Sequence, residues 1–231
     1  MTSDNPAVPV PITAPAGAGA GKTTRDRLIE AAEPLFAEHG IAKASLRAIT
    51  ERAGANLASV HYHFGSKLDL VREVLARRLE PINAERLERL ARAEAEGADL
   101  EDVIHAFVRP ALRLVQEQPG GRDFARLVGR MISEPQPELR TIVLEQFRQV
   151  IERFTAAFSA RLPHLPLQEI FWRFHFMVGT MLYTAGHGEL IERYSEGACD
   201  AQDVDATTRR LVEFLAAGMR AESAATMELR R

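Results

Sequence analysis

The 231-residue sequence has a single cysteine, only three lysines and no excess of positive charge. Because Cys199 has no second cysteine to pair with, an internal disulfide and a metal site built on cysteine pairs are excluded, and a reducing compartment is favoured. The 29 basic residues are outnumbered by 32 acidic ones, which gives a net charge of -3. A protein that coats nucleic acid indiscriminately is therefore excluded.

Long hydrophobic runs are also missing. No stretch of about 18 uninterrupted apolar residues exists, so no helix is predicted to span a membrane and no membrane partner is expected. The N-terminus lacks the basic region and apolar run of a secretory signal, which predicts a cytoplasmic location. What is present, 46% hydrophobic and 26% charged residues, is typical of a globular protein with a sizeable core.

Residues 1–21 differ in composition from the rest of the chain. They hold four of the twelve prolines and three glycines but one charged residue, so they bury too little apolar surface to offset the entropy of ordering, and we predict a disordered tail. The run AGAGAGKT, from Ala16 to Thr23, loosely resembles a phosphate-binding loop. Such a loop needs a buried strand before it, and none precedes this run, so we interpret it as a linker that leads into a helix cap.

Helical periodicity begins near Thr23, and three helices are predicted in quick succession. The first buries apolar residues spaced three or four apart and ends at Gly40. The second begins after the N-cap Ser45 and stops at Gly54, and the third runs from Leu57 to His63. Two short helices joined by a glycine-containing turn predict a helix-turn-helix.

The third helix carries an unusual exposed face. At 100° per residue, Leu57, Val60 and Phe64 share one side and are predicted to pack inward. The outward side then holds Ala58, Ser59, Tyr62 and His63, with His61 on the flank. Hydroxyl and imidazole groups bond readily to phosphates and base edges, so this face suits a DNA groove better than plain solvent.

The remaining sequence predicts a long helix from Lys67 to about Ala95 and five more helical segments. Their predicted bounds are Leu100 to Gln118, Arg122 to Ser133, Pro137 to Leu162, Leu167 to Gly186, and Asp203 to about Ala224. No stretch alternates like a strand. We therefore predict an all-α fold. After the tail (1–21), an N-terminal three-helix helix-turn-helix domain (22–82) is joined by a long helix to a C-terminal helical bundle (83–231). The bundle is expected to bind an effector ligand and to form the dimer.

The run from Arg27 to Leu70 resembles the DNA-binding domain of TetR-family transcriptional regulators. The likeness lies in AA-x-x-LF at 31–36, the Gly40 break, Ser45-Leu46-Arg47-x-Ile49, Ala53-Gly54, and above all VHYHF-x-SK at 60–67. His61 stands where the family usually has an aromatic residue. The resemblance implies a palindromic double-stranded operator as partner. It further implies that Ser45, Tyr62 and Lys67 contact DNA phosphates. The residues implied to make base or mixed contacts are Arg47, Ser59, His61 and His63.

Three later segments resemble the C-terminal domain of PsrA-like regulators, which respond to long-chain fatty acids or their CoA thioesters. They are FARLVG at 124–129, FWRFHFMVG at 171–179 and FLAAGMRAES at 214–223. The resemblance implies a repressor released by a lipophilic or acyl effector, possible ligands being a fatty acid or acyl-CoA. An apolar cavity with basic groups for an acidic head suits such an effector. Its candidate contacts are Arg126, Arg130, Phe171, Arg173, Phe174 and His175.

The helix over 167–186 is apolar nearly all round, so it must be covered on several sides. Together with the last helix it predicts a four-helix interface in a homodimer. A two-fold dimer has the symmetry that a protein needs to bind two DNA half-sites. The candidate interface residues are Trp172, Met181, Leu211, Phe214 and Leu215.

Two other classes of function stay open at this point: an all-α enzyme, and a dimeric adaptor without DNA binding. The enzyme is disfavoured because no HExxH, GxSxG or nucleophile–base pattern occurs, so no catalytic residue, cofactor or metal is predicted. His61 and His63 lie two residues apart on a helix and diverge by about 200°, which argues against a shared metal ion.

Overall fold

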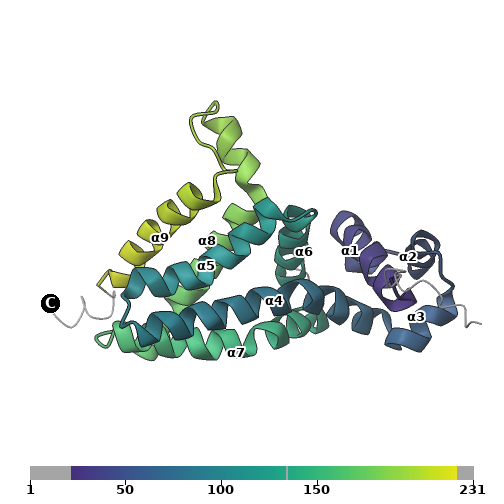
Figure 1. Ribbon diagram of the computed structural model, residues 1–231, viewed down its shortest axis with the longest axis horizontal. Coiled ribbons are helices and arrows are strands. Elements are labelled where there is room, and N and C mark those ends of the chain that lie inside the picture. Colours follow the sequence, from purple (N-terminus) through teal and green to yellow (C-terminus); the bar gives the residue numbers. More distant parts are fainter. Residues whose placement is uncertain (1–21, 134, 223–231) are drawn as a thin grey trace, which may run out of the picture.

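The computed structural model describes residues 22–133 and 135–222, and within these ranges every regular element is a helix (Figure 1). The predicted all-α class is therefore confirmed. The predicted tail, most of the AGAGAGKT run and the last nine residues lie outside the described residues. The helices are α1 (Thr24–Lys43), α2 (Leu46–Ala53), α3 (Leu57–Phe64), α4 (Lys67–Ala95), α5 (Leu100–Glu117), α6 (Gly121–Ser133), α7 (Pro137–Arg161), α8 (Leu167–Tyr194) and α9 (Val204–Arg220).

Short polar side chains start most of these helices. Thr23 caps α1 in a capping box with Asp26, so the predicted helix cap at the end of the AGAGAGKT run is present. Ser45, Asn56 and Ser66 each accept a hydrogen bond from a backbone N–H in the first turn of α2, α3 and α4. These caps satisfy donors that a helix end would otherwise leave unpaired, and they fix where each helix of the head begins.

The long helix α4 belongs to two hydrophobic cores. Its first half, up to Ile82, belongs to a core that it shares with α1, α2, α3, α6 and the start of α7. Its second half, from Leu90, belongs to a core that it shares with α5, α8, α9 and the rest of α7. Figure 1 shows α4 running from the three-helix head into the bundle, with α7 beside it. One rigid element therefore connects the head with the bundle.

A second connection between head and bundle is polar. Arg78 of α4 donates to both carboxylate oxygens of Glu33 in α1, with N–O distances of 2.7 to 3.2 Å. It also donates to the side chain of Gln118 and the carbonyl of Pro119, between α5 and α6, at 3.0 Å each. Hydrogen bonding to Glu33 raises the pKa of Arg78. Bidentate geometry with little solvent makes such a pair stronger than an exposed one.

Four sequence predictions need correction. Gly40 does break the first helix, with φ of 77°, but helical backbone resumes and runs to Lys43. The helix predicted to stop at Gly186 continues to Tyr194, past a non-helical residue at His187, because glycine without a following proline does not force a stop. The last helix ends at Arg220, before the predicted Ala224. Leu57 is 49% exposed rather than packed inward.

The described part of the chain holds neither a membrane-spanning helix nor a cluster of metal-ligating side chains. None of its helices is long and apolar enough to cross a membrane. Nor do its His, Cys, Asp and Glu side chains form a group of three or more that could hold a metal ion.

Candidate DNA-binding surface and effector cavity

The turn between α2 and α3 is set by two residues. Gly54 adopts left-handed backbone angles, with φ of 60° and ψ of 42°, which glycine reaches without steric cost. Asn56 then caps α3, because its Oδ1 accepts from the backbone N–H of Ser59 at 2.9 Å and from the Ser59 hydroxyl at 3.0 Å. This geometry fixes the angle at which α3 leaves α2.

Val60 and Phe64 hold α3 against the head, as predicted, with 0% and 8% of their surface exposed. Leu57 is exposed, unlike Val60 and Phe64. Helical side chains lean toward the N-terminus of their helix, so a residue in the first turn of α3 points past the end of the helix instead of into the core. The opposite side presents Tyr62, which is 86% exposed, and the exposed His61, whose Nδ1 lies 3.1 Å from the carbonyl of Gly65. His63 is half-buried beside the Tyr62 ring. The exposed strip on α3 is therefore polar and aromatic.

The remaining predicted DNA contacts border this strip. Ser45 is exposed, with its Oγ accepting from the N–H of Ala48 at 3.1 Å. Arg47 is exposed and pairs with Glu51, one turn along α2. Lys67, in the first turn of α4, donates to the carbonyl of Ala42 at 3.3 Å, and partial burial lowers its pKa. The seven predicted residues thus lie at the N-cap of α2, on α2 and α3, and at the start of α4.

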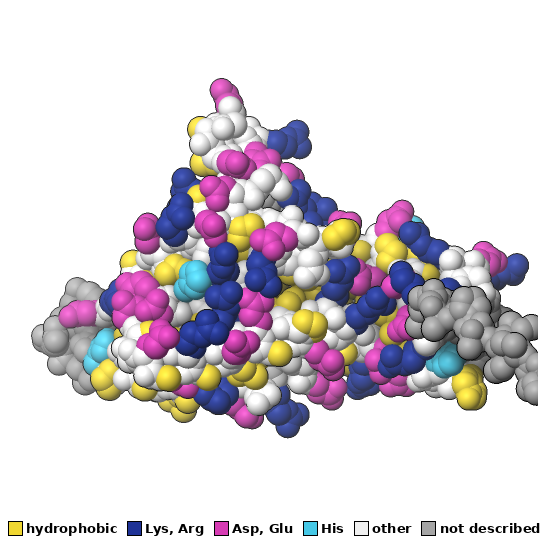
Figure 2. Space-filling view, viewed as in Figure 1, with side chains coloured by type: hydrophobic (Ala, Val, Ile, Leu, Met, Phe, Trp, Pro, Cys, Tyr) yellow, Lys and Arg dark blue, Asp and Glu magenta, His cyan; other side chains and the backbone are white. Residues whose placement is uncertain are grey.

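Figure 2 shows basic and acidic side chains mixed over one face of the whole molecule, with no patch of one sign. A sequence-independent nucleic-acid surface would present a basic stripe. The face shown in Figure 2 lacks such a stripe.

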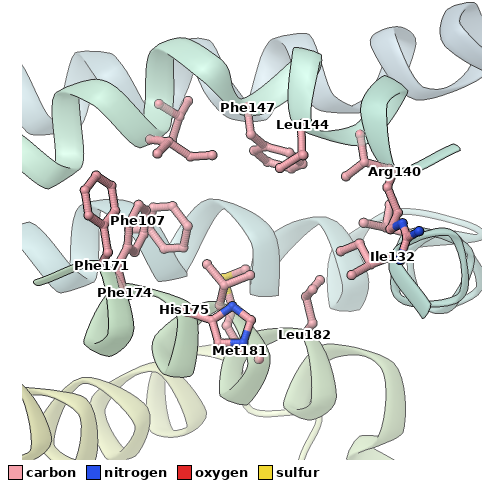
Figure 3. A pocket seen from close by; sticks show the side chains of 16 residues that line it. Phe107, Ile132, Arg140, Leu144, Phe147, Phe171, Phe174, His175, Met181 and Leu182 are labelled. Atoms are coloured by element: carbon pink, nitrogen blue, oxygen red, sulfur yellow. The ribbon is translucent and has the colours of Figure 1, made fainter. Parts of the chain in front are cut away.

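A cavity of about 380 Å³ lies in the bundle between α7 and α8, with Phe107 of α5 behind it (Figure 3). Sixteen residues line it, and all but Arg140, His175 and Gly179 have apolar side chains. Six of the lining residues are exposed and border the mouth: Ile132, Arg140, Leu144, Phe171, His175 and Gly179. The volume falls within the range of small-molecule sites.

Three of the six predicted effector contacts reach this cavity: Phe171, Phe174 and His175. The three arginines do not line it. Arg126 pairs with Glu189 and donates to the carbonyl of Gly186 at 2.9 Å. Arg173 donates to carbonyls at the end of α9, at 2.7 Å for Met219 and Ala221. Arg130 is exposed on α6. Arg126 and Arg173 are therefore engaged by other groups of the protein rather than by the cavity.

The five predicted interface residues divide by exposure. Trp172 and Phe214 are 52% and 68% exposed. Met181, Leu211 and Leu215 are buried inside the protomer, so these three pack in its core instead of on its surface, and Met181 also lines the cavity. On α8 the exposed aromatic strip continues through Phe176 and Tyr183, at 60% and 57% exposure.

Sequence reasoning missed the α7 side of the cavity and the buried Arg86. Val143, Phe147, Val150 and Ile151 are spaced four, three and one apart, an apolar stripe that did carry a signal for α7. Arg86 was also detectable, because it occupies the core stripe of α4 between Ile82 and Leu90. A charged residue at such a position is seldom buried without a reason.

Two segments of the chain match known protein families, and part of the chain also resembles curated transcriptional regulators. Residues 28–74 match the family described as bacterial regulatory proteins, tetR family, and residues 105–218 match a tetracyclin repressor-like C-terminal domain. The uncharacterized HTH-type transcriptional regulator TtgW of Pseudomonas putida is 38% identical over 65 residues, which cover 28% of this chain and 48% of that protein. The chain thus spans about half the length of this curated relative.

Solved structures extend the likeness beyond the head. The fatty acid degradation regulator FadR from Bacillus halodurans has a TM-score of 0.64 at 16% identity, covering 88% of this chain and 100% of that chain. FadR from Bacillus subtilis, solved in complex with stearoyl-CoA, has a TM-score of 0.59 at 15% identity, covering 83% and 97%. At these identities the likeness shows a shared fold.

Head, long helix and bundle together define a helix-turn-helix protein with a C-terminal helical domain. The chain belongs to the TetR family of transcriptional regulators. That family consists of regulators, in agreement with the expectation that the chain is not an enzyme.

Proposed function

We propose that the protein is a dimeric transcriptional repressor that binds a palindromic operator in the cytoplasm and leaves it when a lipophilic, acyl-type effector enters the bundle. The observation that carries the proposal is the sharing of α4. One half of this helix packs with the head that presents α3, and the other half packs with the helices that enclose the apolar cavity.

For DNA binding, the support is the exposed strip of α3 with its flanking phosphate donors. Tyr62 is free to point outward, Ser59 and His63 flank it, and Lys67 stands at the start of the next helix. A helix presented in this way enters the major groove with its side chains toward base edges, while hydroxyl and ammonium groups beside it meet phosphates.

For dimerisation, the support is the apolar surface that α8 and α9 leave uncovered. Trp172, Phe176 and Tyr183 recur along one side of α8, and Phe214 stands out from α9. Exposed aromatic residues gathered in this way mark an interaction surface. A two-fold axis there would give the two α3 helices the symmetry of a palindrome.

An effector can release the operator only if it binds one conformation of the dimer more tightly than the other. Bound in the cavity, it would stabilise a dimer whose two recognition helices are too far apart for the half-sites. The Arg78 contacts with Glu33 and with the segment between α5 and α6 offer a further path by which a shift in the bundle reaches the head.

The proposal is tested by fluorescence anisotropy with labelled DNA from upstream of the protein's own gene. We expect tight binding at low salt, and the logarithm of the binding constant should fall linearly with the logarithm of the salt concentration. The unlabelled palindrome should compete for the protein, whereas a scrambled duplex should not. Lipophilic acids are then titrated into the complex and should release the DNA. Failure to bind any upstream palindromic fragment at low salt would overturn DNA recognition.

A further inference from the structure

Arg86 is a fully buried cation that lacks a carboxylate partner. Only 1% of its surface is exposed, and none of the ion pairs among the described residues includes it. Its Nε donates to the carbonyl of Phe107 at 2.8 Å and Nη1 donates to Oδ1 of Asn83 at 3.1 Å. The neighbouring Glu85 pairs instead with Arg89 at 2.7 Å and Arg113 at 3.0 Å. The positive charge therefore stays uncompensated by any anion within the described protein.

The charge is nonetheless retained at neutral pH. Burial lowers the pKa of Arg86 to about 9, against a small opposing influence of Glu85. Two aromatic faces contribute to holding the cation, since the guanidinium carbon lies 4.2 Å from the ring centre of Phe107 and 5.7 Å from that of Phe147. A buried guanidinium is ordinarily matched by a carboxylate or phosphate, because removing an unpaired charge from water is unfavourable.

The guanidinium lies directly behind the wall of the cavity. Phe107, Phe147 and Met181, which all contact Arg86, also line the cavity. Of these, Met181 presents its sulfur 3.6 Å from Nη2 of Arg86. A thioether is a poor acceptor on a flexible unbranched side chain, so it is readily displaced by a better acceptor that comes from the cavity.

We propose that the effector is a lipophilic anion whose acid group displaces the Met181 thioether and pairs with Arg86 at the base of the cavity. The apolar remainder of the molecule then fills the space between α7 and α8, with its far end toward Arg140 and His175 at the mouth. This proposal deepens the proposed function and rests on it for the consequence of binding: Arg86 belongs to α4, the helix that carries the head.

Isothermal titration calorimetry of the full-length protein at neutral pH tests the proposal with three ten-carbon probes: decanoate, decan-1-ol and decyltrimethylammonium. We expect decanoate to bind about tenfold more tightly than the alcohol, because a charge-assisted hydrogen bond replaces a weak contact with sulfur. The ammonium probe should bind more weakly than either. Equal binding of acid and alcohol, or binding of no probe at all, overturns the proposal.

Two matched variants locate the anion. In Arg86→Met, decanoate should lose its advantage while decan-1-ol keeps its affinity, and in Arg140→Met the advantage should remain. The reverse pattern would place the acid group at the mouth and overturn the assignment to Arg86.

If Arg86→Met does not fold, a crystal structure of the wild-type protein with 10-bromodecanoate decides the orientation. Bromine near Arg140 supports the proposal, and bromine near Phe107 contradicts it.

None of these measurements includes DNA, so they are separable from the proposed function. A protein that binds its operator but shows no preference for the acid disproves only this inference, and a protein that prefers the acid but binds no operator disproves only the DNA-binding role.

Discussion

Replacing Tyr62 by phenylalanine isolates one predicted DNA contact. Tyr62→Phe removes only the hydroxyl, which makes no hydrogen bond to any residue that the structure describes, and keeps the ring against His63 at 5.0 Å. The side chain is 86% exposed, so the melting temperature of the free protein should stay within experimental error of the wild type. The change therefore acts on the complex alone.

The expected loss follows from the kind of bond removed. A hydroxyl donating to a phosphate oxygen contributes about 1.5–3 kcal/mol, which corresponds to a Kd about ten- to a hundredfold higher. Because the phenol is neutral, the slope of log Kd against log salt should not change. Anisotropy at four salt concentrations measures both quantities. Tyr194→Phe, at a 72% exposed position near the end of α8, is the matched control. Wild-type affinity of a folded Tyr62→Phe protein would refute the phosphate contact.

Three further substitutions test other parts of the structure. Lys67→Met should weaken operator binding and reduce the salt slope by about 1, in contrast to Tyr62→Phe, and an unchanged slope would remove Lys67 from the phosphate contacts. Phe214→Arg should convert the dimer to a monomer, as measured by size-exclusion chromatography with light scattering, whereas the control Tyr194→Arg should stay dimeric. If the Phe214→Arg protein is still a dimer, Phe214 does not lie in the interface. Gly121→Ala should cost about 1–3 kcal/mol of unfolding free energy, because its Cβ would stand 2.1 Å from the carbonyl oxygen of Leu114. Gly129→Ala, with open space around the Cβ, should stabilise the helix slightly, and equal effects at both glycines would disprove the clash.

Local signals in the head were strong enough to predict its helices closely. Ser45, Gly54 and Asn56 act through hydrogen bonds and backbone angles within a few residues, so sequence alone locates α2 and α3. The corrections fall where distant packing decides. Periodicity alone put Leu57 on the inward arc of α3, but what covers a side chain depends on the elements that surround it.

The effector cavity was less accessible to sequence reasoning. Aromatic residues on α8 predicted an apolar site, and Phe171, Phe174 and His175 do line the cavity. The charged candidates were drawn from arginines near those motifs, although Arg126 and Arg173 are occupied by carbonyls and carboxylates elsewhere. Arg86 lies 21 residues before Phe107 and 95 before Met181 in the chain, and no local pattern reports that the three meet.

The sequence by itself determined the helical class, the helix-turn-helix and the polar face of α3, because caps, turns and periodicity are short-range properties of the chain. Tertiary structure alone decided which apolar faces cover one another, which arginines are already paired, and where one cation is buried beside an apolar cavity. These outcomes depend on contacts between residues far apart in sequence, and such contacts form only when the helices pack against one another.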